Sequence, residues 1–383
     1  MSVKMRFHEL RAQYLDYKEE INFAVQHVFD SCEFIMGKEV FDFENELAQY
    51  LNCKNVISCG SGTDALLLAL MAIDIKPGDE IITTPFTFIA TAEVICLLGA
   101  TPVFVDIQQD SYNIDVSKIE EKITLKTRAI IPVSLFGQPA DMDEINALAV
   151  EYGARLGNKI YVIEDAAQSL GALYKGKKSA NLSDMGCMSF FPSKPLGCYG
   201  DGGAIAVKDD NLAEKIKSLR VHGQTKRYYH QYIGFNCRLD TIQAAILRVK
   251  LKYFDEELKR RSRIATYYHD SLFNCNVILP TIKSDRTSVY AQYSIRSRDR
   301  DQVIDFLRKT SIPVAVHYSK PLHLQACFRY LNYREGDMPV AEKISNEIFS
   351  IPMSAFITES QQNDVVNSIR KISATVCQDE RIN

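Results

Sequence analysis

One lysine of the sequence differs from the others in its surroundings. Lys194 lies in SFFPSKPLG (189–197), next to prolines and small residues, unlike the lysines in the charged helical stretches of the chain. Burial lowers the pKa of an amine, and a neutral amine can attack a carbonyl carbon to form a Schiff base. Lys194 is therefore a candidate nucleophile, and a lysine on a surface loop is the alternative.

A second candidate is Asp165, which directly follows the expected strand Ile160–Glu164. In open α/β sheets the carboxyl ends of the strands face the ligand crevice. A carboxylate there can hold a proton on a ring nitrogen and keep the ring cationic. Gln168, three residues later, faces the same crevice if a turn or helix begins at this point. The alternative for Asp165 is a helix-capping aspartate.

A candidate anion site lies at Gly60-Ser61-Gly62-Thr63, between the expected strand Asn55–Ser58 and the expected helix Asp64–Ile73. Small residues let backbone amides approach an anion, and a helix N-terminus adds the positive end of its dipole. The hydroxyls of Ser61 and Thr63 offer further donors. An ordinary strand-to-helix turn with Thr63 as N-cap is the alternative.

An aromatic residue, Phe86, follows the expected strand Glu80–Thr84. Its ring can cover a planar ligand, although a phenylalanine of the hydrophobic core is the default interpretation. Each of the four features is a weak signal alone. Their joint order along the chain is a stronger argument: phosphate turn, aromatic ring, ring-nitrogen carboxylate and nucleophilic lysine.

Short apolar strands alternate with helix-length segments from residue 55 to about residue 220, and these elements must position the four features. A strand such as AIIPV (129–133) is apolar throughout, as expected when helices cover both faces of a parallel sheet. The expected strands are Asn55–Ser58, Glu80–Thr84, Thr101–Asp106, Arg128–Leu135, Ile160–Glu164, Cys187–Phe191 and Gly203–Val207. The expected helices include Asp64–Ile73, Thr87–Leu98 and Met142–Tyr152.

The pattern changes after about residue 240. The expected elements there are a long charged helix at Leu239–Asp270, a strand at Val289–Arg296, a helix at Asp299–Lys309, a short strand at Pro313–Val316 and two final helices. This order suits a smaller α+β domain. We therefore expect an N-terminal arm and a large α/β domain over residues 1–245, and a smaller C-terminal α+β domain over residues 246–383.

The composition argues against several other classes of protein. The 45 Lys and Arg residues against 48 Asp and Glu residues give a formal net charge of −3, so we expect neither nucleic acid nor an anionic membrane as a partner. The ten cysteines form no CxxC pair and no cluster with histidine, so no metal site is expected. The chain has no apolar run of membrane-spanning length and no signal-peptide core at its start. We expect a soluble, reduced, cytoplasmic protein.

The local sequences resemble those of the DegT/StrS-type nucleotide-sugar aminotransferases, a family of pyridoxal-phosphate (PLP) enzymes. The most specific motif is SFFPSK (189–194) with GDGG (200–203) downstream. The other motifs are FIMGKEVFDFENELAQYL (34–51), SGTDAL (61–66), IEDAAQSLGALYKGK (163–177), HGQ (222–224), GFNCRLDTIQAAIL (234–247) and VAVHYSKPLH (314–323). The resemblance implies PLP-dependent fold type I, similar to aspartate aminotransferase, with a mostly parallel mixed sheet in the large domain and a smaller α+β domain.

The resemblance also implies roles for individual residues. Lys194 would form the internal aldimine with PLP and move a proton between the cofactor and the substrate carbon, and Asp165 would pair with the pyridinium nitrogen. Phe86 would stack on the ring, and Gln168 would lie near the 3-hydroxyl of the ring. The residues implied in phosphate binding are Ser61, Gly62, Thr63, Ser189 and, from the neighbouring subunit of a homodimer with shared active sites, Asn236.

The presence of Lys194 favours amine transfer, because the sugar dehydratases of this family have histidine at that position. The resemblance implies L-glutamate as the amino donor. Several segments look most like aminotransferases that act on UDP-2-acetamido-2-deoxy-3-oxo-glucuronate and supply 2,3-diamino sugars for bacterial surface polysaccharide such as O-antigen. The implied substrate contacts are Arg238 with the sugar carboxylate, His317 and Tyr318 with sugar hydroxyls, and Arg227 with the diphosphate.

Alternatives to these functional interpretations stay open. Arg238 can instead cap or bridge helices, His317 can be a satisfied histidine at a strand end, and Arg227 can be a solvated cation. Within the family, the acceptor can be a 4-oxo-6-deoxy nucleotide sugar. From a different class, the chain can be a non-catalytic PLP-binding regulatory protein. A nicotinamide dehydrogenase is disfavoured, because no GxGxxG turn follows the first strand.

Overall fold

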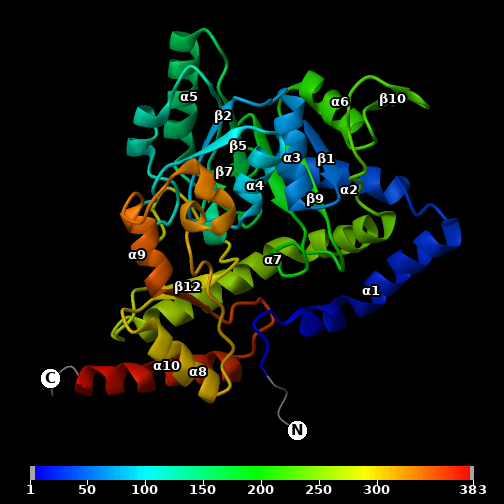
Figure 1. The fold of residues 1–383 in the computed structure, drawn as a ribbon. Helices are drawn as coiled ribbons and strands as arrows, with labels where there is room; N and C mark the ends of the chain where they lie inside the picture. Colours follow the sequence, from blue (N-terminus) through cyan, green and yellow to red (C-terminus); the bar gives the residue numbers. More distant parts are fainter. Residues whose placement is uncertain (1–4, 380–383) are drawn as a thin grey trace.

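A seven-stranded sheet forms the centre of the larger half of the molecule (Figure 1). The computed structural model describes residues 5–379, and the side chains of residues 5–374. The strand order is β1-β9-β8-β5-β4-β2-β3. The bounds are β1 Asn55–Cys59, β2 Glu80–Thr83, β3 Thr101–Phe104, β4 Thr127–Ile131, β5 Tyr161–Asp165, β8 Met185–Ser189 and β9 Gly203–Val207. Only β9 runs antiparallel to its neighbours, which confirms the expected mostly parallel mixed sheet.

Helices cover both faces of this sheet. One face is covered by α3 (Gly62–Ala72), α4 (Ala90–Leu97) and α6 (Asp210–Leu219). On the other face, α2 (Lys38–Leu51) and α7 (Thr241–Leu272) cover β1, β8 and β9, while α5 (Met142–Leu156) covers β2, β4 and β5. Successive residues of a strand point to opposite faces, so a strand covered on both faces is apolar throughout.

The order of the strands brings distant parts of the chain to one edge of the sheet. β1, β2, β4, β5 and β8 all end at this edge, because they run parallel to one another. β9 begins there, since Gly203 pairs with both Cys59 of β1 and Ser189 of β8. The phosphate turn, Asp165 and the loop that carries Lys194 therefore follow strand ends on the same side of the sheet.

The C-terminal part packs around a two-stranded antiparallel sheet of β12 (Tyr293–Arg296) and β13 (Ile348–Ile351). Its helices are α8 (Arg300–Lys309), α9 (Pro339–Glu347) and α10 (Glu359–Asp379). The expected strand at Pro313–Val316 is wrong, because this segment contributes only one bridge, between Ala315 and Ser350. The strand that pairs with β12 is β13, which the sequence reading missed.

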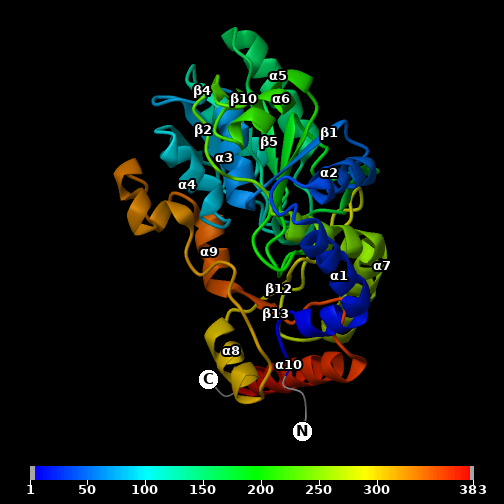
Figure 2. The same cartoon turned by 90° about the vertical axis from the view of Figure 1, so that its right-hand side faces the viewer.

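One long helix belongs to both parts. Near its start, α7 packs Ala244 and Leu247 against the large sheet, and near its end it packs Tyr268 and Leu272 into the core of the smaller part. The N-terminal helix α1 (Leu10–Ser31) lies along α7, as both views show (Figures 1 and 2). The division at residue 245, which falls within α7, stays a prediction.

Short elements complete the described chain. The remaining strands are β6 Leu173–Tyr174, β7 Lys177–Lys178, β10 Gln224–Lys226 and β11 Tyr229–His230, and the 3₁₀ helices are η1 Val116–Lys118, η2 Glu120–Lys122, η3 Leu135–Gly137, η4 Leu322–Leu324 and η5 Ala326–Leu331. Within residues 5–379, no helix has both the length and the apolar character that crossing a bilayer requires. The nine cysteines with described side chains are free thiols, and Cys377 lies outside those side chains.

Candidate active site

The turns after β1 and β8 touch at the carboxyl edge of the sheet. A Cβ added to Gly62 would lie 2.7 Å from the Cβ of Ser189, and one added to Gly203 would lie 2.3 Å from the carbonyl oxygen of Ser61. Neither position has room for a side chain, so glycine is what allows the backbones to approach. The structure thus brings Ser61, Gly62 and Ser189 together.

The helix after the first of these turns begins two residues earlier than the alternative interpretation requires. Ser61 is the N-cap of α3, and its Oγ accepts a hydrogen bond of 3.0 Å from the backbone nitrogen of Asp64. Thr63 therefore lies in the first turn and is not the N-cap. The first amides of a helix have no acceptor within the helix, so those of Gly62 and Thr63 are suited to hold an anion.

Asp165 is a buried carboxyl group with two hydrogen-bond donors. Its exposed fraction is 6%, and it accepts a bond of 2.8 Å from Thr91 Oγ1 and one of 3.2 Å from the backbone nitrogen of Ala167. Burial raises the pKa of Asp165, while these donors and the nearby Lys194 act in the opposite direction. Turns follow at residues 167–171, so the helix-capping alternative does not hold.

The amine of Lys194 lies near this carboxyl group. Removal from water lowers its pKa, and the charge of Asp165 only partly opposes this effect. The residue is half-buried rather than exposed, and its backbone nitrogen donates a bond of 2.8 Å to the carbonyl of Phe191. The structure therefore argues against a solvated surface lysine and places an amine with a lowered pKa near Asp165.

Gln168 connects this region to the C-terminal part of the chain. Its Oε1 accepts a bond of 2.7 Å from the backbone nitrogen of Phe136, and its Nε2 donates a bond of 3.4 Å to the hydroxyl of Tyr318. Burial and the charge of Asp165 raise the pKa of Tyr318. Gln168 and Tyr318 therefore lie close to Asp165, on segments that are far apart in the sequence.

Two phenylalanines near Tyr318 differ sharply in exposure. Phe86 is 0% exposed, and its ring centroid lies 6.2 Å from that of Tyr318 and 6.4 Å from that of Phe136. Phe88 is 56% exposed, with its ring centroid 6.4 Å from that of Tyr318. The stacking role of Phe86 stays a prediction, and Phe88 is a second aromatic candidate that the sequence reading did not single out.

Two histidines flank the lysine, and one of them was not expected. His317 Nδ1 lies 3.0 Å from Ser350 Oγ, and burial, aided by the charge of Lys194, lowers its pKa to about 4. His8, on the N-terminal segment, has a pKa lowered to about 4 by burial, with smaller effects of Arg261, His317 and Lys194. No motif surrounds His8, so only the path of the N-terminal segment across the site reveals it.

Three of the expected ligand-binding residues are not bonded to the lysine and aspartate of the site among the described residues. Arg227, Asn236 and Arg238 make no hydrogen bond or ion pair with Lys194 or Asp165 in the part of the chain that the structure describes. Arg227 is exposed on the β10–β11 hairpin, and Asn236 is exposed beside Val221. Nε of Arg238 is buried without a hydrogen-bond partner. The backbone of this segment borders the phosphate turn, since Gly60 donates a bond of 3.0 Å to the carbonyl of Cys237.

The chemistry of these groups fits PLP. The turn around Gly62 offers amides and hydroxyls to a phosphate, and the glycine positions leave no side chain in the way. The carboxylate of Asp165 can accept a hydrogen bond from the protonated ring nitrogen, and the amine of Lys194 can form a bond with an aldehyde carbon. Among the described residues, no group of three or more His, Cys, Asp or Glu side chains is placed to hold a metal ion.

Comparison with known proteins gives consistent results. Residues 15–370 match the DegT/DnrJ/EryC1/StrS aminotransferase family. The UDP-2-acetamido-2-deoxy-3-oxo-D-glucuronate aminotransferase of Pseudomonas aeruginosa is 47% identical over 92% of this chain and 96% of its own length. A pleiotropic regulatory protein of Geobacillus stearothermophilus is 45% identical over 94% of this chain and 96% of its own length.

A solved structure agrees with these relatives. S. venezuelae DesV, solved in complex with a ketimine intermediate, superposes with a TM-score of 0.94 at 35% identity, covering 97% of this chain and 99% of its own. Aminotransferases of the family depend on PLP, and solved relatives include a form with PLP bound. This chain therefore belongs to the DegT/DnrJ/EryC1/StrS aminotransferase family and is a PLP-dependent sugar aminotransferase.

Proposed function

We propose that this chain transfers the amino group of L-glutamate to UDP-2-acetamido-2-deoxy-3-oxo-D-glucuronate, and so supplies a 2,3-diamino sugar for bacterial surface polysaccharide. The observation that carries this proposal is the 47% identity to the P. aeruginosa aminotransferase named for that substrate, over 92% of the chain. The lysine at position 194 supports amine transfer over dehydration.

The residues of the site have distinct roles in this proposal. When bound, PLP supplies a ring that withdraws electrons from the substrate carbon. Lys194 would attach the cofactor and carry a proton to and from that carbon, and its lowered pKa increases the neutral fraction of the amine, which is the form that accepts a proton. Thr91 fixes one oxygen of Asp165, which holds the ring nitrogen. Ser61, Gly62, Thr63 and Ser189 hold the phosphate.

The remaining residues of the site are assigned to binding of the sugar nucleotide and to the second subunit. Arg238 pairs with the sugar carboxylate, which would give its buried Nε an acceptor. His317 and Tyr318 bind sugar hydroxyls, and Arg227 binds the diphosphate. Asn236 is exposed and has no bond to the phosphate turn of its own chain among the described residues, which supports a role in the partner's site. We therefore propose a homodimer with shared active sites.

The substrate is tested by mass spectrometry with L-glutamate and three acceptors: the UDP-3-oxo-glucuronate compound, its counterpart with a neutral C6, and a 4-oxo-6-deoxy nucleotide sugar. We expect preference for the uronate. Arg238→Gln should raise KM for the uronate about a hundredfold and affect the neutral sugar less, because a lost charge-assisted pair costs on the order of 2–3 kcal/mol. Arg227→Gln, a change at another cation, should not separate the two sugars. Turnover of the 4-oxo sugar alone would refute the 3-oxo assignment.

The alternative from a different class is a PLP-binding regulatory protein without catalysis, which the assignment to an aminotransferase family disfavours. A regulatory protein of G. stearothermophilus is nevertheless 45% identical to this chain, so the two functions are compared directly. Adding L-glutamate to the PLP-loaded protein and recording its absorbance separates the two functions. An aminotransferase converts the band of the bound aldehyde form to that of the amine form, whereas an unchanged band would support the regulatory protein.

A further inference from the structure

We propose that Lys250 is a positioning residue that holds the loop carrying Lys194, which rests on the proposed role of Lys194 in attaching the cofactor. Lys250 lies on α7 and is 1% exposed. Its Nζ donates a hydrogen bond to the carbonyl oxygen of Gly197, three residues after Lys194. A buried lysine thus lies behind the loop, on the helix that joins the two parts of the molecule.

Backbone hydrogen bonds within the loop after β8 hold its shape, from Phe190 to Cys198. The backbone nitrogen of Lys194 donates to the carbonyl of Phe191 at 2.8 Å, and that of Cys198 donates to the carbonyl of Phe190 at 2.8 Å. A Cβ added to Gly197 would lie 2.5 Å from the carbonyl oxygen of Pro192. The loop is therefore tightly packed upon itself, and the carbonyl of Gly197 bonds to α7 through Lys250.

An acidic side chain on the same helix affects the pKa of the buried amine. Glu257, two turns further along α7 and 3% exposed, raises the pKa of Lys250, although burial outweighs this effect and lowers it to about 8. Glu257 in turn accepts two hydrogen bonds of 2.9 Å from Gln13 Nε2 of α1. Nζ of Lys250 also lies 4.9 Å from the ring centroid of Tyr199, at the end of the loop. Lys250 is thus a direct contact between α7 and the loop, while Glu257 joins the same helix to Gln13 of α1.

The contact between Lys250 and Gly197 does not depend on the charge of Lys250, because a deprotonated lysine also donates a hydrogen bond. Lys250 therefore acts on the site without touching the substrate. Loss of the donor leaves a buried carbonyl without a partner and frees the loop to shift. A shift of about 1 Å in a catalytic group can cost up to a hundredfold in rate.

The test compares Lys250→Met with Lys250→Arg, which keeps a donor, and with Lys252→Met as the matched control. Lys252 lies on the same helix but is exposed and pairs with Glu20 at 3.1 Å. Each PLP-loaded protein is titrated with pH by following the absorbance of the bound cofactor, and its kcat, KM and melting temperature are measured. K250M should lower kcat about tenfold or more, leave KM for L-glutamate within about twofold and move the pKa of the absorbance change by about half a unit or more. K250R should restore most of both effects, and K252M should match the original protein.

The outcomes separate this inference from the proposed function. A K250M protein that melts earlier but keeps its absorbance pKa and kcat would show that Lys250 is merely structural. If K250M does not fold, Lys250→Gln replaces it, since the shorter side chain takes the donor away from the carbonyl of Gly197 but stays polar, and should move the absorbance pKa in the same direction. An unchanged pKa in K250Q would then overturn the inference. Borohydride reduction and peptide mapping of the original protein test Lys194 independently, because a label elsewhere would refute the proposed function itself.

Discussion

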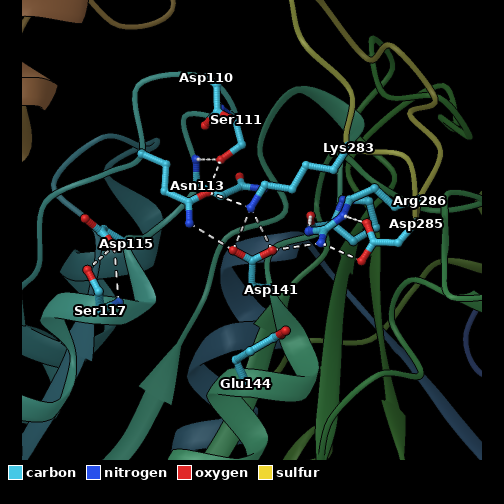
Figure 3. Close-up of polar contacts among 12 residues, drawn as sticks. Asp110, Ser111, Asn113, Asp115, Ser117, Asp141, Glu144, Lys283, Asp285 and Arg286 are labelled. Carbon is cyan, nitrogen blue, oxygen red and sulfur yellow. Dashed lines mark hydrogen bonds and ion pairs between the residues drawn. The ribbon is translucent and has the colours of Figure 1, made fainter.

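Asp141 and Arg286 form an ion pair of 2.8 Å that joins the start of α5 to the chain returning from α7 (Figure 3). The side chain of Arg286 is buried, at 3% exposure, and that of Asp141 is mostly covered, at 13%. Asp141 also accepts hydrogen bonds of 2.8 Å from Lys283 and 2.9 Å from Gln108. The backbone nitrogen of Lys283 donates to Gln138 at 2.9 Å. One carboxylate thus fixes the connection between the two parts of the molecule.

Removal of this carboxylate should destabilise the protein strongly. Asp141→Ala removes the partner that Arg286 and Lys283 share, while Arg286 keeps its ion pair with Asp285, so the loss in free energy of unfolding should approach but not exceed the about 3–5 kcal/mol of a broken buried pair. Chemical denaturation measures this loss. Asp143→Asn is the matched control, because Asp143 pairs with Lys175 while both are exposed, and such a change should cost less than about 1 kcal/mol. Equal effects of the two substitutions would contradict the prediction.

The same carboxylate predicts a dependence of stability on pH. Burial alone would raise the pKa of Asp141, but hydrogen bonds from Lys283 and Gln108 and the nearby cations outweigh it, so the pKa lies below its ordinary value. The stabilisation is therefore complete above the ordinary carboxyl pKa of about 4 and is lost as the pH falls through the lower folded value. Denaturation curves of the original protein and D141A should converge in acid. A constant difference down to pH 2 would argue against this origin.

Asp165→Asn should abolish most of the catalysis without unfolding the protein. The amide keeps an oxygen for the bond from Thr91 but carries no negative charge for the ring nitrogen, so kcat should fall about a hundredfold or more. Glu164→Gln is the matched control at the neighbouring position. Glu164 is 0% exposed and accepts bonds of 2.7 Å from Ser134 and 2.6 Å from Ser179. Glu164→Gln should lower the free energy of unfolding and change kcat little. If it instead abolishes catalysis while Asp165→Asn does not, the ring nitrogen is held by Glu164 and not by Asp165.

Regular elements of the large sheet could be predicted from sequence because their residues are apolar on both faces. The expected strand Gly203–Val207 agrees with β9 at both ends. The segment Pro313–Val316 has a similar apolar pattern but lies beside β13, with a bridge only at Ala315. Local pattern does not determine which apolar segments obtain a complete set of partners, and this is why β13 was missed.

Part of the site could also be predicted, because it lies at the ends of these strands. Asp165 and the loop of Lys194 follow parallel strands, and the ends of such strands share an edge. His8 and Lys250 could not be found in this way. Lys250 lies in RVKLKYFDEELKRR (248–261), where charged residues look alike, and only the packing of α7 against the loop buries this lysine while Lys252 stays exposed. Their positions depend on tertiary packing.

His8 and His317 should make the protein less stable at mildly acidic pH. Burial, with the charge of Lys194 and, for His8, that of Arg261, lowers the pKa of each imidazole to about 4, whereas an unfolded chain has a value of about 6.5. The unfolded state therefore binds more protons between these values, and the free energy of unfolding falls as the pH drops. Between pH 7 and pH 5 the loss is on the order of 2 kcal/mol for each imidazole.

Substitution of one imidazole checks this assignment. His8→Gln should reduce the slope of unfolding free energy against pH between about 6.5 and 4, measured by denaturation in urea. His27→Gln, at an exposed position on α1, is the matched control for the loss of one imidazole. A slope that H8Q does not alter would mean that His8 is protonated equally in the folded and unfolded states.

The two phenylalanines after β2 should have separable effects. A ring that covers a bound cofactor needs an accessible face beforehand, and Phe88 is 56% exposed whereas Phe86 is 0% exposed. Phe88→Leu should weaken PLP binding about tenfold, since an aromatic stacking contact contributes about 0.5–1.5 kcal/mol, and should leave the stability of the PLP-free protein nearly unchanged. Absorbance titration with PLP gives the dissociation constant.

Phe86→Leu is the matched substitution and distinguishes the two rings. Phe86 packs among Tyr112, Phe136 and Tyr318, so its replacement should lower the free energy of unfolding of the PLP-free protein by about 1–3 kcal/mol, as expected for a change of shape in a packed core. Its dissociation constant for PLP should change little. If F86L instead weakens PLP binding and F88L does not, the ring that stacks on the cofactor is Phe86, and the core must open to expose it.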